Sequence, residues 1–383
     1  MLRWILSWMT FWMACGHSAE WPQWRGPGHD GRWNPPGVPA DPAACEPQCR
    51  WTVEVGGGFG GVTVADGRVY LMERVTEPEE RERLRCFSAE DGTQLWVKEW
   101  PVRYASLEYG NGPRSSVTLS EGAAFALGAT GRVGCWDAAT GVERWHRDVV
   151  EELGARQPKW GFAASPVREG ENILLHVGAQ PEGCVVALQA ATGEEVWRGG
   201  DDAAGYCTPM VVTHGGRRQV IQWGPGRVMG LEAASGSTLW SYPYPIRYGV
   251  SIAQPLYLDG LLLVSSYWHG ARALRLNAAG DAVELAWKDE EGLCGLMAAP
   301  LEKEGTVFFL DRHHGLQALD LATGKIHWRD ENTLTPADRN PQMSLVWMDE
   351  TRDLAALLNA DGELVMARLT AEARTELGRW QVS

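Results

Sequence analysis

Ala138-Ala139-Thr140-Gly141-Val142-Glu143-Arg144-Trp145 is one of several near-copies of a single pattern in this chain. The pattern predicts a β-hairpin, in which one strand runs into the turn, glycine takes the left-handed position, and the return strand carries the tryptophan. Four further copies keep the glycine four residues before the tryptophan, at Ala89–Trp96, Ala190–Trp197, Ala233–Trp240 and Leu321–Trp328. Two looser copies occur at Ala278–Trp287 and Glu372–Trp380.

The spacing of the pattern indicates a repeat protein. Its tryptophans lie 41 to 52 residues apart, and an Asp-Gly or Glu-Gly turn before an apolar run adds a second hairpin to most units. A repeat of this length with four short strands is typical of a propeller blade. We therefore predict an all-β propeller of seven four-stranded blades between Trp51 and Trp380, closed into a ring by a first strand at Trp51–Val55. Eight blades, with the N-terminal arm in a degenerate one, are the alternative.

The repeated tryptophans explain why the blades need one another. A single four-stranded sheet cannot cover an indole, whereas the next blade can. We expect the tryptophans to dock between successive blades, at Trp96, Trp145, Trp197, Trp240, Trp287, Trp328 and Trp380.

The first residues predict export. Arg3, the apolar run Trp4–Ala14 and the small residues before Glu20 form a signal peptide over residues 1–19, and the run is too short to span a bilayer. Residues 20–50 form an arm rich in Pro, Gly and Trp, and residues 51–383 form the propeller. A lipid anchor at Cys15 is the less favoured alternative, because Trp12-Met13-Ala14 is a poor lipobox.

Charge and cysteine content narrow the function classes. The net charge of −14 argues against nucleic acid and against anionic membrane surfaces, since both attract clustered Lys and Arg. Cys86 and Cys135 occupy matching places in adjacent units, too far apart for a disulfide, and we expect buried thiols. A bond between Cys45 and Cys49 stays open.

The pattern at Trp136–Trp145 and Ala318–Trp328 resembles the repeat of the pyrroloquinoline-quinone (PQQ)-like β-propeller superfamily. That group includes quinoprotein alcohol dehydrogenases and a propeller lipoprotein of the outer-membrane β-barrel assembly machinery. Trp21–Pro27 and Gly112–Ser116 look like exported PQQ-like proteins of planctomycete-type bacteria. The resemblance implies a quinone and calcium site only for the dehydrogenases, and their vicinal cysteine pair has no counterpart in this sequence.

The candidate site is the mouth of the central channel, where loops lead into the innermost strands. An aromatic residue followed by glycine recurs at Tyr109, Trp160 and Tyr248, and arginines stand nearby. These loops predict a surface for a ligand or partner, formed by Arg103, Tyr109, Asn111, Arg114, Trp160, Tyr206 and Tyr248. The alternative is that the rings only fill the channel and brace the turns.

No catalytic residue and no metal site is predicted. The adjacent His313 and His314 point to opposite faces if they lie on a strand, which disfavours a shared metal ion. We expect a non-catalytic exported protein that binds an envelope protein partner, in the periplasm or cell envelope, with no transmembrane segment in the mature chain and no cofactor. A PQQ- and calcium-dependent oxidoreductase is one alternative, and a carbohydrate-binding propeller is another.

Overall fold

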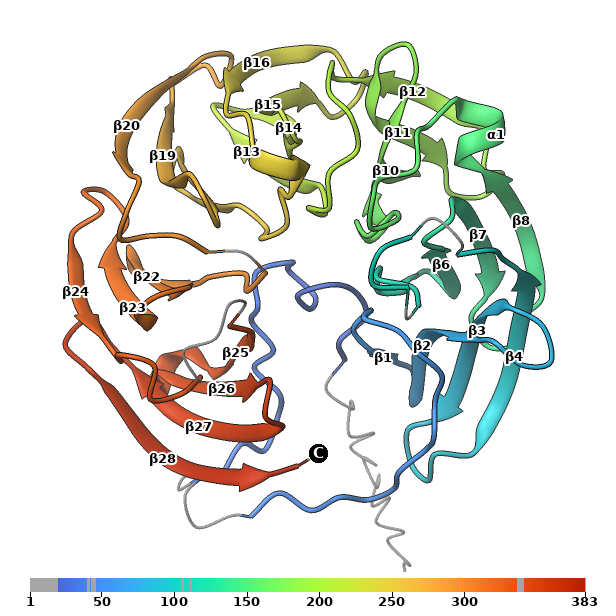
Figure 1. Cartoon of the computed structure of the whole chain (residues 1–383), viewed down its shortest axis with the longest axis horizontal. Helices are drawn as coiled ribbons and strands as arrows, with labels where there is room; N and C mark the ends of the chain where they lie inside the picture. The colour runs from blue at the N-terminus through green and yellow to red at the C-terminus, as the bar shows by residue number, and fades with distance from the viewer. Residues whose placement is uncertain are drawn as a thin grey trace, which may run out of the picture.

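The fold consists of seven antiparallel sheets of four strands each, arranged in a circle (Figure 1). A computed structural model describes residues 20–39, 42, 46–104, 107–110, 112–295, 297–335 and 341–382. The first strand of each sheet lies towards the centre and the fourth lies at the rim (Figure 1). The prediction of an all-β chain with seven four-stranded units is confirmed.

Each sheet is one continuous stretch of chain, and the sheets are numbered here 1 to 7 in chain order. Sheets 1 to 3 contain β1 (Thr63–Ala65), β2 (Arg68–Val75), β3 (Arg81–Ser88), β4 (Gln94–Pro101); β5 (Thr118–Ser120), β6 (Ala123–Leu127), β7 (Arg132–Asp137), β8 (Glu143–Asp148); β9 (Val167–Glu169), β10 (Asn172–Ala179), β11 (Gly183–Gln189) and β12 (Glu195–Gly199). Sheets 4 and 5 contain β13 (Met210–His214), β14 (Arg217–Trp223), β15 (Arg227–Glu232), β16 (Thr238–Pro243); β17 (Leu256–Leu258), β18 (Leu261–Ser266), β19 (Gly270–Leu276) and β20 (Val283–Asp289). Sheets 6 and 7 contain β21 (Leu301–Lys303), β22 (Thr306–Asp311), β23 (Gly315–Asp320), β24 (Ile326–Arg329); β25 (Met343–Asp349), β26 (Leu354–Asn359), β27 (Glu363–Leu369) and β28 (Arg374–Gln381).

The repeated pattern forms the hairpin between the third and fourth strands of a sheet. In sheet 2, Gly141 has a φ of 69° in the turn between β7 and β8. A Cβ atom on Gly141 would lie 2.7 Å from the Trp96 ring. Because glycine has no side chain, the indole of sheet 1 can pack directly on this turn of sheet 2. The pattern therefore encodes a turn and the socket for the preceding sheet's tryptophan together.

The indole N–H groups connect successive sheets. Trp96 donates to the main-chain oxygen of Ala138, and Trp145 donates to that of Ala190, at 3.1 and 2.8 Å. The same contact recurs from Trp197 to Ala233, from Trp287 to Leu321 and from Trp328 to Thr370. Trp240 differs, because it is buried between sheets 4 and 5 but donates to Gln219 of its own sheet.

The tryptophan that docks on sheet 1 comes from the N-terminal side of the chain. Trp51 donates to the oxygen of Ala89 at 3.1 Å and packs over Gly92. We expected Trp51–Val55 to form a strand near the last blade, and this prediction was wrong. Residues 51–55 form no strand, and Gly57 makes one isolated bridge to Arg74 of sheet 1. The backbone lies too close for side chains there, since a Cβ on Gly56 would lie 2.2 Å from the Arg74 oxygen.

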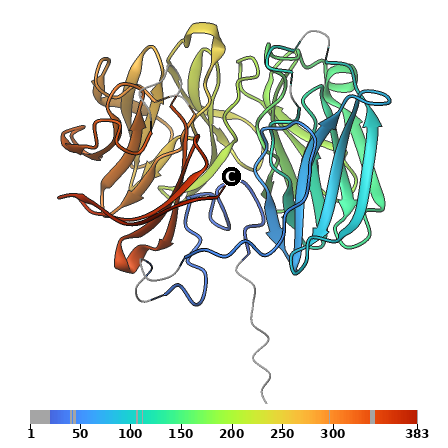
Figure 2. The same cartoon turned by 60° about the horizontal axis from the view of Figure 1, so that its bottom comes forward.

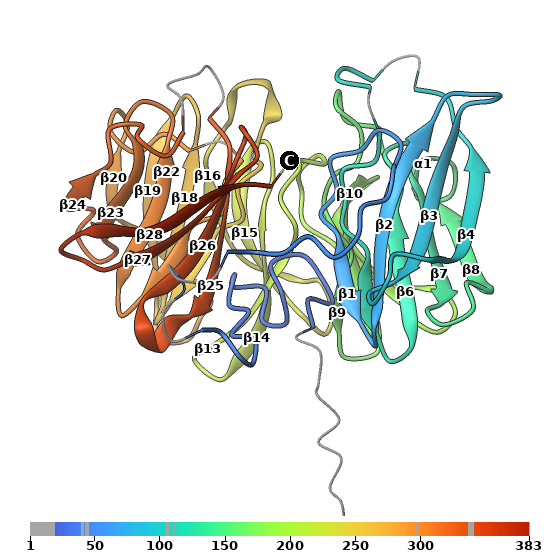
Figure 3. The ribbon, with the colours of Figure 1, turned by 90° about the horizontal axis from the view of Figure 1, so that it is seen from below.

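The N-terminal arm joins sheets 1 and 7 at the centre of the circle. Trp21 exchanges two main-chain hydrogen bonds with Val64 of β1, and Arg32 forms a parallel bridge with Trp347 of β25. Arg32 also forms an ion pair with Glu350 at 2.7 Å and one with Glu302 at 3.2 Å. The segment 20–34 therefore lies across one end of the central opening, as Figures 2 and 3 show in blue.

The structure tests the expectations for most of the cysteines, whereas the expected signal peptide lies outside the described residues. The five buried cysteines, Cys86 and Cys135 among them, are free thiols, as predicted for that pair. Cys49 is an exposed free thiol, whereas Cys45, Cys15 and the expected signal peptide at residues 1–19 lie outside the described residues.

The one α-helix in the described part, α1 (Val149–Leu153), begins at the Asp148 cap and ends at Gly154. Within the same residues, we find no helix with the length and apolar character needed to cross a bilayer.

Candidate functional site

The loops that join consecutive sheets gather on one face of the circle. Figure 3 shows α1, which begins the loop after β8, on the face opposite the N-terminal arm. The predicted site residues lie in these loops, and we call their surface the mouth. The described part of it consists of Arg103, Tyr109, Arg114, Trp160, Tyr206 and Tyr248, while Asn111 lies outside the described residues.

Arg114 organises the part of the mouth that follows sheet 1. Its guanidinium donates to the main-chain oxygens of Gly112 and Tyr109, both at 2.6 Å, and of Glu108 at 3.0 Å. These bonds hold Tyr109 in a left-handed conformation, with φ at 50° and the side chain 69% exposed. Burial lowers the pKa of Arg114. The arginine is thus a brace for the loop, and the tyrosine ring is presented to solvent.

Trp160 and Tyr206 form an aromatic pair beside Arg114. Their ring centroids lie 5.6 Å apart with the planes at 63°, and both pack against the core between sheets 4 and 5. Burial raises the pKa of Tyr206 to about 12, so its hydroxyl is neutral and can donate. Lys159 stacks over the Trp160 ring at 5.3 Å. The structure therefore brings Tyr109, Arg114, Trp160 and Tyr206 into one neighbourhood.

Tyr248 belongs to a second group further round the mouth. Its ring contacts Trp268 at 5.4 Å, and the Arg247 guanidinium lies 5.0 Å above the Tyr248 ring. Tyr267 and Arg312 extend this stack. The sequence reasoning missed Trp268, Tyr267 and Arg312, because they lie in the turns between second and third strands and not in the loops that enter the inner strands. Paired aromatics next to those turns were the available signal.

Arg103 stands apart from both groups. It is exposed, and the described contacts do not join it to the other mouth residues. Its neighbour Tyr104 is buried and donates to the Glu82 carboxylate, which also accepts from Trp100 Nε1 at 3.0 Å and from the Ala129 amide at 2.8 Å. Burial raises the pKa of Glu82. This buried carboxyl group anchors the loop that carries Arg103.

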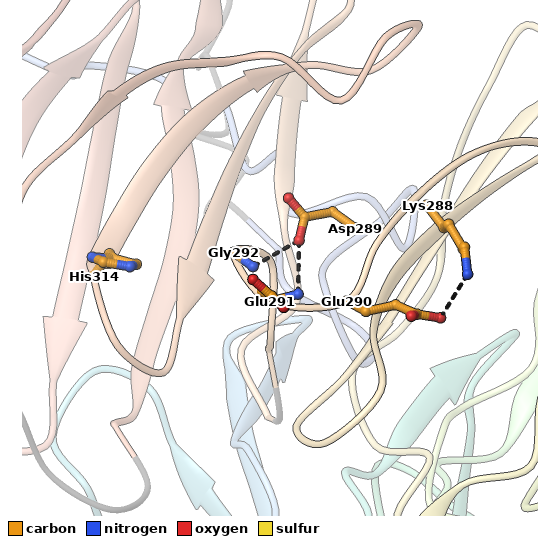
Figure 4. A pocket seen from close by; sticks show the side chains of 6 residues that line it. All are labelled: Lys288, Asp289, Glu290, Glu291, Gly292 and His314. Atoms are coloured by element: carbon orange, nitrogen blue, oxygen red, sulfur yellow. Dashed lines mark hydrogen bonds and ion pairs between the residues drawn. The ribbon is translucent and has the colours of Figure 1, made fainter.

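Two cavities lie away from the predicted residues. One, of about 450 Å³, lies between the arm and the inner strands, with Arg25, His29, Glu169 and Arg218 in its wall. The other is an open cleft of about 690 Å³ between the ends of β20 and β22 (Figure 4). Two of its acidic side chains are engaged locally, since Asp289 accepts from the amides of Glu291 and Gly292 and Lys288 pairs with Glu290.

The oxidoreductase alternative requires a metal site, and the described residues show no cluster of His, Cys, Asp and Glu side chains for one. A calcium-assisted quinone would require several carboxylate or amide oxygens around one point. The described residues contain no group of three or more His, Cys, Asp or Glu side chains that could hold a metal ion. His314 lies 3.4 Å from Glu331, and no third ligand joins them there. Since three such side chains do not meet at one point among the described residues, we derive no catalytic step through a calcium-bound quinone.

Comparison with known proteins places this geometry in context. A family model described as outer membrane protein assembly factor BamB matches residues 80–297 and 270–376, which is more than half of the chain. The serine/threonine-protein kinase AfsK of Streptomyces griseus is 25% identical over 281 residues, covering 69% of this chain and 29% of the kinase. The chain thus spans less than a third of that relative.

Solved structures share the fold at low identity. BamB from Moraxella catarrhalis superposes with a TM-score of 0.58 at 16% identity, covering 84% of this chain and 85% of BamB. A quinohemoprotein alcohol dehydrogenase from Comamonas testosteroni superposes with a TM-score of 0.68 at 14% identity, covering 96% of this chain and 73% of the enzyme. A europium-containing methanol dehydrogenase superposes with a TM-score of 0.62 at 12% identity, covering 86% of this chain and 79% of the enzyme. At these identities, the similarity shows the fold alone.

Proposed function

This chain belongs to the family described as outer membrane protein assembly factor BamB, and from that membership we propose that it is a non-catalytic, protein-binding scaffold of the cell envelope. The observation that carries the proposal is the family match over residues 80–376, within the PQQ-like propeller fold. Export by the N-terminal segment is part of the same proposal.

The mouth supports protein binding by its composition. Tyr109 and Tyr248 are 69% and 58% exposed. Arg114 donates to the main-chain oxygen of Tyr109, and the Arg247 guanidinium lies over the Tyr248 ring. Exposed, rigid tyrosines beside arginines are the residue types that dominate protein interfaces. We therefore assign partner contact to Tyr109, Trp160, Tyr206 and Tyr248, with Arg114 as the group that positions Tyr109.

The experiment is affinity purification from envelope extract with the parent chain, Tyr109→Ala plus Tyr248→Ala, and Val196→Ala. Val196 is 50% exposed on β12, away from the mouth, and serves as the control. We expect a partner recovered with the parent and the control, and at least tenfold less with the double variant. Equal recovery with all three would remove the mouth from the proposal.

The oxidoreductase alternative has its own direct test. Purified protein is mixed with PQQ and calcium, and quinone absorbance and alcohol-dependent dye reduction are followed. We expect no tight binding and no turnover. Saturable quinone binding together with dye reduction would contradict the scaffold proposal and support the oxidoreductase alternative.

A further inference from the structure

Each innermost strand has one edge that faces the central opening. In an antiparallel ladder, alternate residues turn their main-chain N–H and C=O groups away from the paired strand. In sheet 1, Ala65 pairs with Arg68 across a two-residue turn, so the preceding residue, Val64, turns these groups towards the opening. The hydrogen bonds confirm it, because Val64 bonds through both groups to Trp21 of the arm.

The arm occupies this edge in sheets 1 and 2 as an extended peptide. The amide of Trp21 donates to the Val64 oxygen at 2.8 Å, and its oxygen accepts from the Val64 amide at 2.9 Å. The next residue, Pro22, accepts from the Leu119 amide of sheet 2 at 2.8 Å. Two consecutive residues of the arm thus bind the inner edges of two consecutive sheets through main-chain groups.

The arm reaches the inner edge again in sheets 6 and 7. The amide of Trp347 donates to the Gly31 oxygen at 2.8 Å, and its oxygen accepts from the Trp33 amide at 3.0 Å. In sheet 6, the Glu302 main-chain oxygen accepts from the Arg32 guanidinium at 2.8 Å. The arm therefore binds the inner edge of four of the seven sheets.

Sheets 3, 4 and 5 keep the same edge free. By the same alternation, Arg168, Val211 and Tyr257 turn their main-chain N–H and C=O groups towards the opening. Among the described residues, these groups have no hydrogen-bond partner. All three residues line the cavity of about 450 Å³ between the arm and the inner strands. The free edges and the cavity form one place, which we call the inner-edge site.

The size of the inner-edge site suits a small ligand. A water molecule occupies about 30 Å³ in the liquid, so the cavity has room for far more than one or two ordered waters. Ligand sites in proteins typically have volumes of about 300–1,000 Å³. The cavity, at about 450 Å³, lies within that range.

One guanidinium in the wall of the site has no acidic partner. Arg25 donates from Nε to the His29 oxygen, and from Nη2 to the Asp30 and Pro300 oxygens, which are all main-chain groups. In the described part of the chain, nothing accepts a hydrogen bond from its Nη1. This nitrogen therefore has N–H groups available for a carboxylate, which guanidinium groups bind with strong, charge-assisted bonds.

The acidic side chains of the wall are already engaged. The two oxygens of Glu169 accept from Arg218, at 2.8 and 2.7 Å. Asp30 and Glu302 both form ion pairs with Arg32. A cationic ligand would find these three carboxylates occupied, whereas a carboxylate would find a guanidinium without an acidic partner.

We propose that the inner-edge site binds a short extended peptide with an acidic side chain, in the way that the arm binds sheets 1 and 2. The main chain of the peptide bonds to Arg168, Val211 and Tyr257, as an added strand bonds to a sheet edge, and its carboxylate bonds to Arg25. The inference goes beyond the proposed function, because this site lies at the arm end of the opening, on the face opposite the mouth (Figure 3).

The probe is a pool of tetrapeptides, acetylated and amidated at their ends and randomised at every position. The pool is passed over the immobilised full chain, and the retained peptides are sequenced by mass spectrometry. We expect enrichment of Asp and Glu, and saturable one-to-one binding of the most enriched peptide. A pool methylated on its main-chain nitrogens should not be retained, because it cannot donate to the free edge. No retained peptide, or equal retention of the methylated pool, would overturn the inference.

Val211→Pro tests the edge directly, because proline removes an N–H that faces the cavity and that the ladder does not use. Thr213→Pro is the matched control, since Thr213 has the same register two residues further along β13 but lies outside the cavity wall. The most enriched peptide should bind Val211→Pro at least tenfold more weakly than it binds Thr213→Pro and the parent. Thermal melting shows that each variant is folded. Equal binding to all three chains would contradict the site.

Two further variants separate the carboxylate and the mouth from the edge. Arg25→Gln should abolish the enrichment of Asp and Glu, and an unchanged enrichment would contradict the assigned carboxylate contact. Tyr109→Ala plus Tyr248→Ala should bind the peptide as the parent does, because the mouth takes no part. Tenfold weaker binding to that double variant would place the peptide at the mouth and overturn the inference.

Discussion

The indole of Trp96 in sheet 1 donates its N–H to the main-chain oxygen of Ala138 in sheet 2 at 3.1 Å, and its ring fills the space above Gly141. This pair is the unit from which the circle is built. Five other tryptophans donate to a main-chain oxygen in the same way. Under four of these five rings, at Trp51, Trp145, Trp197 and Trp287, a turn glycine again makes room for the indole.

Removing one docked indole should destabilise the whole chain. Trp197 is 7% exposed and donates to Ala233. Trp197→Ala should lower the free energy of unfolding by about 3–5 kcal/mol, because a large buried ring is lost and a cavity is left. Chemical denaturation measures it, and Trp197→Phe, which keeps most of the volume, should lose clearly less. An unchanged stability would show that the indole is not a structural wedge.

The glycine under the indole should be irreplaceable for a reason beyond its φ. Gly141 and Gly67 have φ values of 69° and 68°, but a Cβ meets nothing within 4 Å at Gly67. Gly67→Ala should cost about 1–2 kcal/mol from the left-handed conformation alone. Gly141→Ala should cost about 1–3 kcal/mol more, because the methyl group overpacks against Trp96. If Gly67→Ala and Gly141→Ala lowered the free energy of unfolding equally, Gly141 would not be needed to make room for the Trp96 ring.

Trp51 should matter for sheet 1 in particular. It is half-buried over Gly92, and Trp51→Ala should cost roughly half of the 3–5 kcal/mol expected for a fully buried tryptophan. Hydrogen exchange should accelerate first in the turn between β3 and β4. If exchange rose instead only in sheet 7, Trp51 would serve the last blade, as the sequence had suggested.

Glu82 gives the stability a pH dependence with a defined sign. Burial raises the folded-state pKa of this carboxyl group, so its contribution is fully present below the unfolded-state pKa and declines as the pH rises towards the folded-state pKa. Glu82→Gln removes this titration. The unfolding free energy of the parent minus that of the variant should therefore fall between pH 4 and pH 7. A difference that rises with pH would mean that the hydrogen bonds from Tyr104, Trp100 and the Ala129 amide lower the pKa of Glu82 more than burial raises it.

Much of the fold could be predicted because its decisive residues repeat. The Gly-to-Trp spacing defined the hairpins, the turn glycines and seven four-stranded units. Trp51 lies 45 residues before Trp96, within the repeat period, yet the pattern's glycine is missing before it and its role was missed. The circle is bridged by Trp21 and Arg32, whose partners in β1 and β25 are far away in sequence. Such contacts leave no local periodicity.

The candidate site was predictable only in part for the same reason. Aromatic-glycine pairs marked Tyr109, Trp160 and Tyr248, since the loop conformation is local. The contact of Tyr248 with Trp268 joins the loop before β17 to the turn between β18 and β19, which are separate in the sequence.

Site-specific photo-crosslinking in envelope preparations tests the scaffold and its surfaces most directly. A benzophenone side chain is placed at position 109, at position 248 or, as the control, at position 285 of the full chain, and the crosslinked products are identified by mass spectrometry. Leu285 is 41% exposed on β20 and does not belong to the mouth. We predict that positions 109 and 248 capture the same envelope protein and that position 285 captures none. Equal labelling from all three positions, or no crosslinked protein at any of them, would contradict the account.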